Sequence, residues 1–269
     1  MRKIRNYSTY LYLNAKTSFN ALYTYKAASL LNFITQIILI LAQFYLWKAV
    51  YANTSSINNY TFTDMITYLV ITFSIGRLYP FNVSSKFGRM VKNGDVIHSL
   101  LKPIGLEYQL LTDSFGELLY KLLFTATPII LTGYFLLGIK LSLEPGIVII
   151  FCLFWVSSYL FIFALELFIG VFSFYTQSLW GINNFKSSII NLLSGKILPL
   201  NFYPLVFRNF IYYLPFSTIY FIPISVLMGK KVNHLVVFLG IIWSSTILLF
   251  VLYKILSSIM IKKIMIQGG

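Results

Sequence analysis

The chain has 269 residues, of which 58% are hydrophobic and 10% are charged, and its mean hydropathy is +0.79. Soluble domains carry about a quarter charged residues, so this composition excludes an ordinary soluble domain and indicates a protein whose solvent is a lipid bilayer. The net charge of +14 does not indicate nucleic-acid binding, because the basic residues stand between apolar runs and form no single patch.

The first segment, residues 1–27, has an apolar spacing that predicts a helix. Leu11, Ala15, Phe19 and Leu22 recur at intervals of four, four and three, which places them on one helical face. Basic and aromatic residues surround that face, as in helices that lie in the cytoplasmic interface of a membrane. An extended tail is the alternative.

Six segments are candidates for membrane spans, each needing roughly 20 mostly apolar residues. The candidates are 30–50, 65–83, 118–137, 147–171, 180–200 and 235–256. The second carries Arg77 and Pro80 near its end, and the fifth is weak because it contains Lys186, Lys196 and several Asn and Ser residues. The only cysteine, Cys152, lies in the fourth span, so neither disulfides nor a cysteine metal site can organise the fold.

The distribution of basic residues favours six crossings with both termini in the cytoplasm. If the weak fifth segment did not cross, Lys262 and Lys263 would move outside, against the tendency of basic residues to stay inside. We therefore expect a single membrane domain, residues 1–269, that is all-α and multi-pass. The polar residues of the fifth span either mark the transport pathway or pack between neighbouring helices.

The cytoplasmic loop 84–115 contains the stretch "KNGDVIHSLLKP". Asn93-Gly94 indicates a turn, Asp95 is a suitable N-cap, and Pro103 ends a helix that we expect over 96–101. Val96, Ile97, Leu100 and Leu101 share one face, which predicts docking to a cytoplasmic partner. The alternative is that this face packs on the protein's own helices or on the lipid surface. His98 has no second metal ligand at useful spacing.

The segment 198–233 is rich in proline, which interrupts helices. It contains Pro199, Pro204, Pro215 and Pro223, half of the eight prolines in the chain. We expect two short helices, about 205–213 and 217–228, with Gly229 as a C-terminal stop. Because prolines interrupt these helices too often for two ordinary crossings, we predict that the segment is a re-entrant pair on the extracellular side.

Catalytic and nucleotide-binding motifs are not found in the sequence. The P-loop pattern is missing, because Gly195-Lys196 and Gly229-Lys230 have Ile190 and Ile224 where its first glycine belongs. The chain is therefore predicted not to be an enzyme and to bind no cofactor. Glu166 lies within the fourth span, with Lys186 and Arg77 as possible partners; it is either a pathway or gating residue or a structural one.

Three stretches carry a resemblance to a known family. They are "NGDVIHSLLKPIGLEYQ", "IGVFSFYTQSLWGI" and "SGKILPLNFYPLVFRNFIYYLPFSTIYFIPISVLMGK". In their order and spacing the chain resembles the six-span permease subunits of ABC-2 type ABC transporters. Lys196 stands where the family pattern leads us to expect Arg.

This resemblance implies an ATP-driven exporter in a bacterial cytoplasmic membrane. The permease would pair with a second one, identical or homologous, and with cytoplasmic P-loop ATPase subunits that hold ATP and Mg. It would move an apolar or amphipathic peptide, lipid or drug; an ATP-independent carrier or a membrane assembly factor is the alternative. The coupling helix to the ATPase would comprise Gly94, Asp95, Val96, Ile97, His98, Leu100, Leu101, Lys102 and Pro103. The candidate pathway or gating residues are Glu166, Asn183, Asn184, Lys186, Pro199, Pro204 and Pro215.

Overall fold

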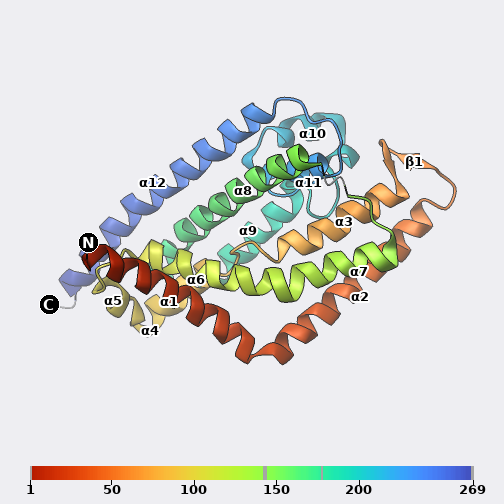
Figure 1. Cartoon of the computed structure of the whole chain (residues 1–269). Coiled ribbons are helices and arrows are strands. Elements are labelled where there is room, and N and C mark those ends of the chain that lie inside the picture. Colours follow the sequence, from red (N-terminus) through yellow and green to blue (C-terminus); the bar gives the residue numbers. More distant parts are fainter. Residues whose placement is uncertain (1, 142–143, 177, 268–269) are drawn as a thin grey trace.

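The computed structural model describes residues 2–141, 144–176 and 178–267, and its architecture is almost entirely helical (Figure 1). The helices are α1 (Arg2–Thr24), α2 (Lys26–Val50), α3 (Phe62–Gly76), α4 (Val83–Asn93), α5 (Asp95–Leu100), α6 (Leu106–Lys121), α7 (Thr127–Leu137), α8 (Pro145–Val171), α9 (Trp180–Leu193), α10 (Leu205–Tyr212), α11 (Phe221–Leu227) and α12 (Leu235–Gln267). A π-helical segment, Leu122–Ala126, joins α6 to α7, and short 3-10 turns cover Phe172–Phe174, Leu200–Phe202 and Pro215–Thr218.

The N-terminal segment forms the predicted helix, so the extended alternative is wrong. Helix α1 packs along α6, where the Asn14 side chain donates hydrogen bonds to the Gln109 carbonyl (3.0 Å) and the Thr112 hydroxyl (2.9 Å). Gly116 allows the close approach, because a Cβ there would collide with the Ala15 carbonyl. The position of α1 at a membrane surface stays a prediction.

Four helical stretches among the described residues are long and apolar enough to cross a membrane. They are Ala27–Val50, Leu106–Leu137, Pro145–Phe174 and Leu235–Met260, and a fifth is obtained if the bent pair in 205–227 counts as one span. Helices therefore occupy four of the six predicted windows at full length. The helix in the third predicted window, 118–137, begins earlier than predicted, because α6, the π segment and α7 form one continuous helix, Leu106–Leu137.

The other two windows contain helices that are shorter than predicted. Helix α3 has 15 residues and ends at Gly76, since Pro80 prevents continuation toward residue 83. Helix α9 has 14 residues and ends at Leu193, just before Gly195 adopts a left-handed φ of 80°. The number of crossings therefore stays a prediction.

The proline-rich segment forms two short helices, as predicted, and they are bent by 77° relative to each other. The second helix begins at Phe221 and not at Ser217, because Pro215–Thr218 is a 3-10 turn. Gly229 ends it with a φ of 69°. The segment is fastened inside the bundle: the Tyr79 hydroxyl donates to the Ile219 carbonyl (2.6 Å) and Ser158 to the Thr218 carbonyl (2.7 Å).

A small hairpin between α2 and α3 was not predicted. Strands β1 (Ser56–Ile57) and β2 (Tyr60–Thr61) are antiparallel, and Asn58 and Asn59 form the turn with φ of 50° and 63°. Asparagine tolerates this left-handed conformation, which two-residue hairpin turns of the I′ type require. Lys230 ties the hairpin to the connection between α11 and α12 by donating to the Asn59 carbonyl (2.9 Å).

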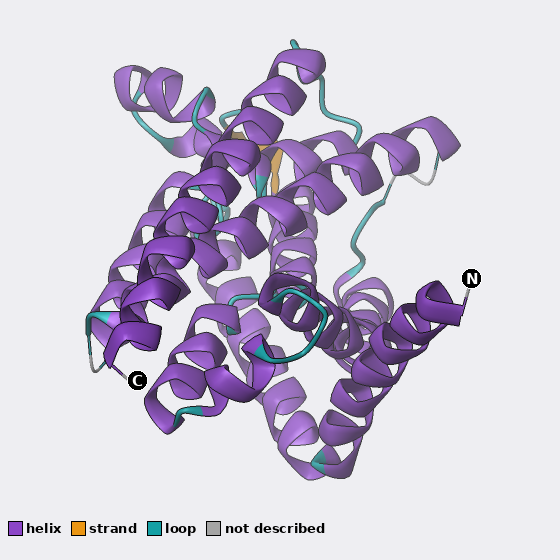
Figure 2. Ribbon diagram, turned by 90° about the vertical axis from the view of Figure 1, so that its left-hand side faces the viewer, coloured by secondary structure: helices purple, strands orange, loops and turns teal. Residues whose placement is uncertain are grey.

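The bundle has two distinct ends. The beginning of α1 and the end of α12 lie at one end together with α4 and α5, whereas the β hairpin and α10 lie at the other (Figure 1). Figure 2 looks onto the first end, where the chain termini flank the short helices between α3 and α6. Helix α12 lies along α8, so the last helix returns the chain to the end from which it began.

Candidate functional site

The predicted docking helix is present, and a glycine sets its direction. Helix α4 ends at Asn93, and the φ of 80° at its C-cap, Gly94, lets the chain turn sharply into the six-residue helix α5. Nothing lies within 4 Å of a Cβ built on Gly94, so the turn needs glycine for its backbone conformation alone. The N-cap is Gly94 and not Asp95, which is the first helical residue and makes no side-chain capping bond.

The apolar face of α5 is divided between the protein's own core and the surface. Val96 is 3% exposed and packs with Phe87, Leu106 and Leu110, whereas Ile97 is 50% and Leu101 is 78% exposed. Leu100 is half-buried against the same core. The side chain of Val96 is therefore not available to a partner, and the exposed apolar surface consists of Ile97 and Leu101.

The polar neighbours of this surface are also accessible. Asp95, His98, Lys102 and Pro103 are exposed, and Lys102 donates a hydrogen bond to the Tyr10 hydroxyl of α1 (3.2 Å). Gln109 of α6 anchors the backbone of α5 and of the turn after it, because its amide donates to the carbonyls of Ser99 (2.9 Å) and Ile104 (2.8 Å). Helix α5 is thus anchored to α6 on its inner side, while its outer face is exposed.

A buried ion pair joins α8 to α9 beside the start of α4. Glu166 of α8 pairs with Lys186 of α9, and the two side chains are 0% and 5% exposed. The second carboxylate oxygen of Glu166 accepts a hydrogen bond from the Ser84 backbone N–H (2.8 Å) in the first turn of α4. A carboxylate is favoured there, because the first turn of a helix leaves backbone N–H groups unpaired and carries a partial positive charge.

Asn183 extends the pair into a network across three helices. Its side-chain oxygen accepts from Lys186 (2.9 Å) and from the Ser84 hydroxyl (2.9 Å), and its amide donates to the Ser85 hydroxyl (3.2 Å). The network joins the start of α4 to α8 and α9. Phe87 reinforces the contact, because its ring lies so close to Gly170 of α8 that any Cβ there would collide.

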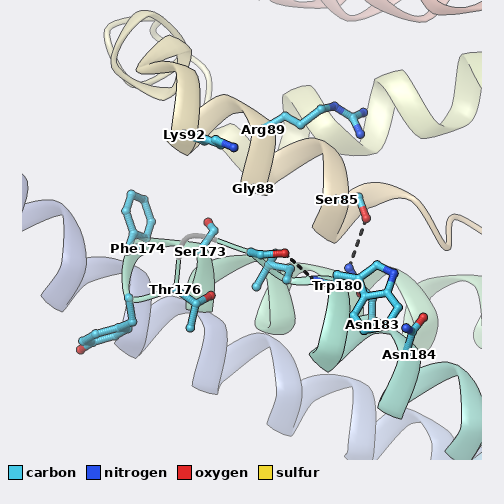
Figure 3. Close-up of a pocket in the computed structure, with 13 residues that line it drawn as sticks. Ser85, Gly88, Arg89, Lys92, Ser173, Phe174, Thr176, Trp180, Asn183 and Asn184 are labelled. Carbon is cyan, nitrogen blue, oxygen red and sulfur yellow. Dashed lines mark hydrogen bonds between the residues drawn. The ribbon is translucent and has the colours of Figure 1, made fainter.

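A crevice of about 740 Å³ opens beside this network, between α4 and the segment that leads into α9. Figure 3 shows Ser85, Gly88, Arg89 and Lys92 along α4 on one side of the crevice. On the other side lie Ser173, Phe174, Thr176, Trp180 and Asn184, and a bond joins Ser85 to Asn183. No carboxylate is among the described residues that line it. The sequence offered little signal for this crevice, since its two sides are about 90 residues apart in the chain.

The family model for ABC-2 family transporter proteins matches residues 37–268. This chain belongs to the ABC-2 family. It is accordingly a multi-pass membrane protein and a permease component of an ABC transporter, a part that transports and does not itself catalyse. No curated protein matches the chain.

The structure of this ABC-2 permease brings together some of the predicted pathway residues and separates others. Glu166, Asn183 and Lys186 form one network, and Lys186, not Arg77, is the partner of Glu166. Asn184 lines the adjacent crevice. The prolines lie apart from it and shape the proline-rich segment: Pro199 and Pro204 precede the helical turns at 200–202 and 205–212, and Pro215 begins the next turn.

No metal site is visible in the described part of the ABC-2 chain. Among its described residues, no group of three or more His, Cys, Asp and Glu side chains lies close enough together to hold an ion. His98 is exposed at the surface of α5, and Cys152 is exposed on α8.

Proposed function

We propose that this chain is the permease subunit of an ATP-driven exporter in a bacterial cytoplasmic membrane. A separate P-loop ATPase, holding ATP and Mg, docks on α5, and a second permease, identical or homologous, completes the transporter. The cargo is an apolar or amphipathic peptide, lipid or drug. The observation that carries the proposal is the helix α5 in a member of this family: it is short, anchored by Gln109, and exposes Ile97 and Leu101 beside basic residues.

The proposed topology has six crossings with both termini in the cytoplasm. In support, α1 begins and α12 ends at the end of the bundle that holds α5 (Figure 1), as expected for a chain with an even number of crossings. Helices α3 and α9 cross as shortened spans, each about 20 Å long at 1.5 Å per residue, and the interrupted segments that follow them complete the passage. With this orientation the inside segments carry more basic residues than the outside loops.

The proposed mechanism transmits movement of the ATPase through α5 and α4 to α8 and α9. ATP closes the ATPase dimer, and this rigid-body movement displaces the docked α5. Because Ser84 at the start of α4 is bonded to Glu166, and Glu166 to Lys186, the displacement reaches α9 through a buried, charge-assisted network. Moving α4 relative to α9 also changes the width of the crevice that the two elements line.

The docking surface is tested with Ile97→Asp combined with Leu101→Asp. A charge at each exposed position adds no buried charge to the membrane domain but opposes burial against a partner, so the ATPase should no longer co-purify with the tagged permease. The matched control is Leu205→Asp with Val206→Asp, two exposed residues of α10 at the opposite end. That control should retain the ATPase.

Co-purification followed by mass spectrometry decides between the two candidate classes of protein. A stoichiometric P-loop ATPase lost only in the α5 variant supports the exporter. Retention of the ATPase by that variant would show that docking occurs elsewhere. A chain that purifies without any ATPase and transports in liposomes without ATP would instead be a secondary carrier.

A further inference from the structure

A second cavity, of about 430 Å³, lies between α2, α3 and the segment that follows α9. It differs from the surrounding apolar helices in the polarity of its walls. The polar residues that line it are Gln36, Gln43, Thr72, Arg77, Asn191 and Lys196.

Two of these residues are cations with no acidic partner. Arg77 and Lys196 line the same cavity, no carboxylate is among its described lining residues, and neither forms an ion pair within the described part of the chain. Like charges that share a cavity repel each other, and removing them from water without a counter-ion is unfavourable. An anion placed between Arg77 and Lys196 would relieve this repulsion.

The chain does not supply that anion. It has seven acidic residues, and five of them are already paired with lysines elsewhere. The pairs are Lys86–Asp113, Lys121–Glu117, Lys186–Glu166, Lys230–Asp64 and Lys254–Glu107. The remaining two are Asp95 on α5 and Glu144 before α8, and neither lines the cavity.

Both cations are placed by well-fixed backbone. Lys196 follows Gly195, whose carbonyl accepts a hydrogen bond from the buried Tyr68 hydroxyl (2.6 Å), and the Phe221 N–H donates to the Ser194 carbonyl (3.1 Å). Arg77 is the C-cap of α3, where a positive charge is favoured by the helix dipole. The charges thus belong to the framework of the bundle and not to a loose loop.

The side of the cavity that α2 forms also carries polar side chains that can bind an anion. Gln36 and Gln43 are seven residues apart, so they lie on one face of a helix that is otherwise strongly apolar. Polar side chains on membrane helices face a partner, a cavity or a ligand. Their amide groups add hydrogen-bond donors around the two cations, while Leu39 and Phe73 supply apolar surface beside them.

We propose that this cavity binds the anionic group, a carboxylate or a phosphate, of an amphipathic molecule. The inference rests on the proposed transport function and narrows its cargo to amphipaths that carry a negative charge. Arg77 pairs with two oxygens through its planar guanidinium, and Lys196 adds a point charge. A cavity of this size encloses a headgroup and leaves the apolar tail against the neighbouring helices.

The test is a binding measurement on the full chain, with its co-purifying ATPase, in phosphatidylcholine nanodiscs. The probes are 11-(dansylamino)undecanoic acid and its methyl ester, followed by dansyl fluorescence. The acid should bind roughly tenfold more tightly than the ester, as expected for hydrogen bonds to a charged group. Arg77→Gln with Lys196→Gln should abolish this preference and leave ester binding unchanged, which also shows that the variant is folded.

Two control variants keep the test specific. Arg77→Lys with Lys196→Arg retains both charges and should keep a preference for the acid. Lys231→Gln removes an exposed cation outside the cavity and should behave as the unaltered protein does. Equal binding of acid and ester by the unaltered chain would overturn the proposal, and so would a preference that survives the double glutamine variant.

The remaining measurements separate the sources of the anion and the two proposals. The binding of the acid is measured again in nanodiscs that contain one part phosphatidylglycerol in four. If the lipid weakens acid binding only in variants that keep both cations, the anion bound in the cavity is a lipid phosphate. If acid binding is unchanged, the site is assigned to a transported acid. If an ATPase co-purifies and the chain binds acid and ester equally, the exporter proposal is retained and the anion-site proposal is rejected. If the chain prefers the acid but no ATPase co-purifies, the anion-site proposal is supported and the exporter proposal is rejected.

Discussion

At the scale of single residues, the Glu166–Lys186 pair is the most consequential feature. Both charges are buried, and each has further partners: Glu166 accepts from Ser84, and Lys186 donates to Asn183. A buried pair gains little net stability over apolar residues of the same size, but removing only one partner leaves an uncompensated charge in the interior. The pair therefore restricts which arrangements of α4, α8 and α9 are accessible.

Glu166→Gln is expected to lower the free energy of unfolding by about 3–5 kcal/mol, because Lys186 would remain charged and buried without its counter-ion. Adding Lys186→Met should recover most of that loss, since the glutamine still accepts from Ser84 and no buried charge remains. Unfolding in mixed micelles of increasing SDS content measures both variants. A double variant as unstable as the single one would contradict this account of the pair.

At the scale of elements, the proline-rich segment 198–233 is stabilised by buried tyrosines that donate hydrogen bonds to its backbone or to the backbone just before it. Tyr79 of the α3–α4 connection donates to Ile219, and Tyr68 of α3 donates to Gly195. Non-helical backbone in a membrane protein needs such partners, because each unpaired polar group in an apolar surrounding costs free energy. The polar hydroxyls thus replace the water that a surface loop would use.

Tyr79→Phe should destabilise the fold by about 1–3 kcal/mol, since it leaves the buried Ile219 carbonyl without its donor. Tyr220→Phe is the matched control: this ring is equally buried, but its hydroxyl has no hydrogen-bond partner among the described residues. Its removal should be neutral or slightly stabilising. Thermal unfolding of the two variants is compared under identical detergent conditions. An equal loss of stability in both variants would contradict the stabilising role of the Tyr79 hydrogen bond.

At the scale of the whole molecule, the two ends of the bundle differ in what they offer. One end holds α5, the exposed Ile97 and Leu101, and the crevice beside α4, whereas the other holds the hairpin and α10. A transporter driven by a soluble ATPase needs such an asymmetry, because the energy enters from one side only. The proposed six crossings place the two ends on opposite faces of the membrane.

Single cysteines in a Cys152→Ala background test this topology with a membrane-impermeant maleimide. Asn58→Cys in the hairpin and Asn209→Cys in α10 should react in intact cells. Asn93→Cys before α5 and Ser178→Cys before α9 should react only after the cells are opened. If positions 178 and 209 reacted from the same side, α9 would not cross and the number of spans would be smaller.

Some features of the candidate site could be predicted because they depend on neighbouring residues. Asn93-Gly94 and Pro103 bounded the short helix almost correctly, and the isolated acid Glu166 drew attention on its own. The exposure of α5 could not be predicted in the same way. Val96 and Ile97 are adjacent and equally apolar, and only packing against Phe87 and Leu106 decides which of them is buried.

By itself, the sequence determined that this is a helical membrane protein, where most of its long helices run, and where proline and glycine interrupt them. These are local properties, since hydropathy and backbone conformation depend on a few residues at a time. The tertiary structure alone decided the partner of Glu166 and the placement of Arg77 and Lys196 on one cavity. The residues of these two pairs stand 20 and 119 positions apart, and a linear pattern does not record which distant groups packing will bring together.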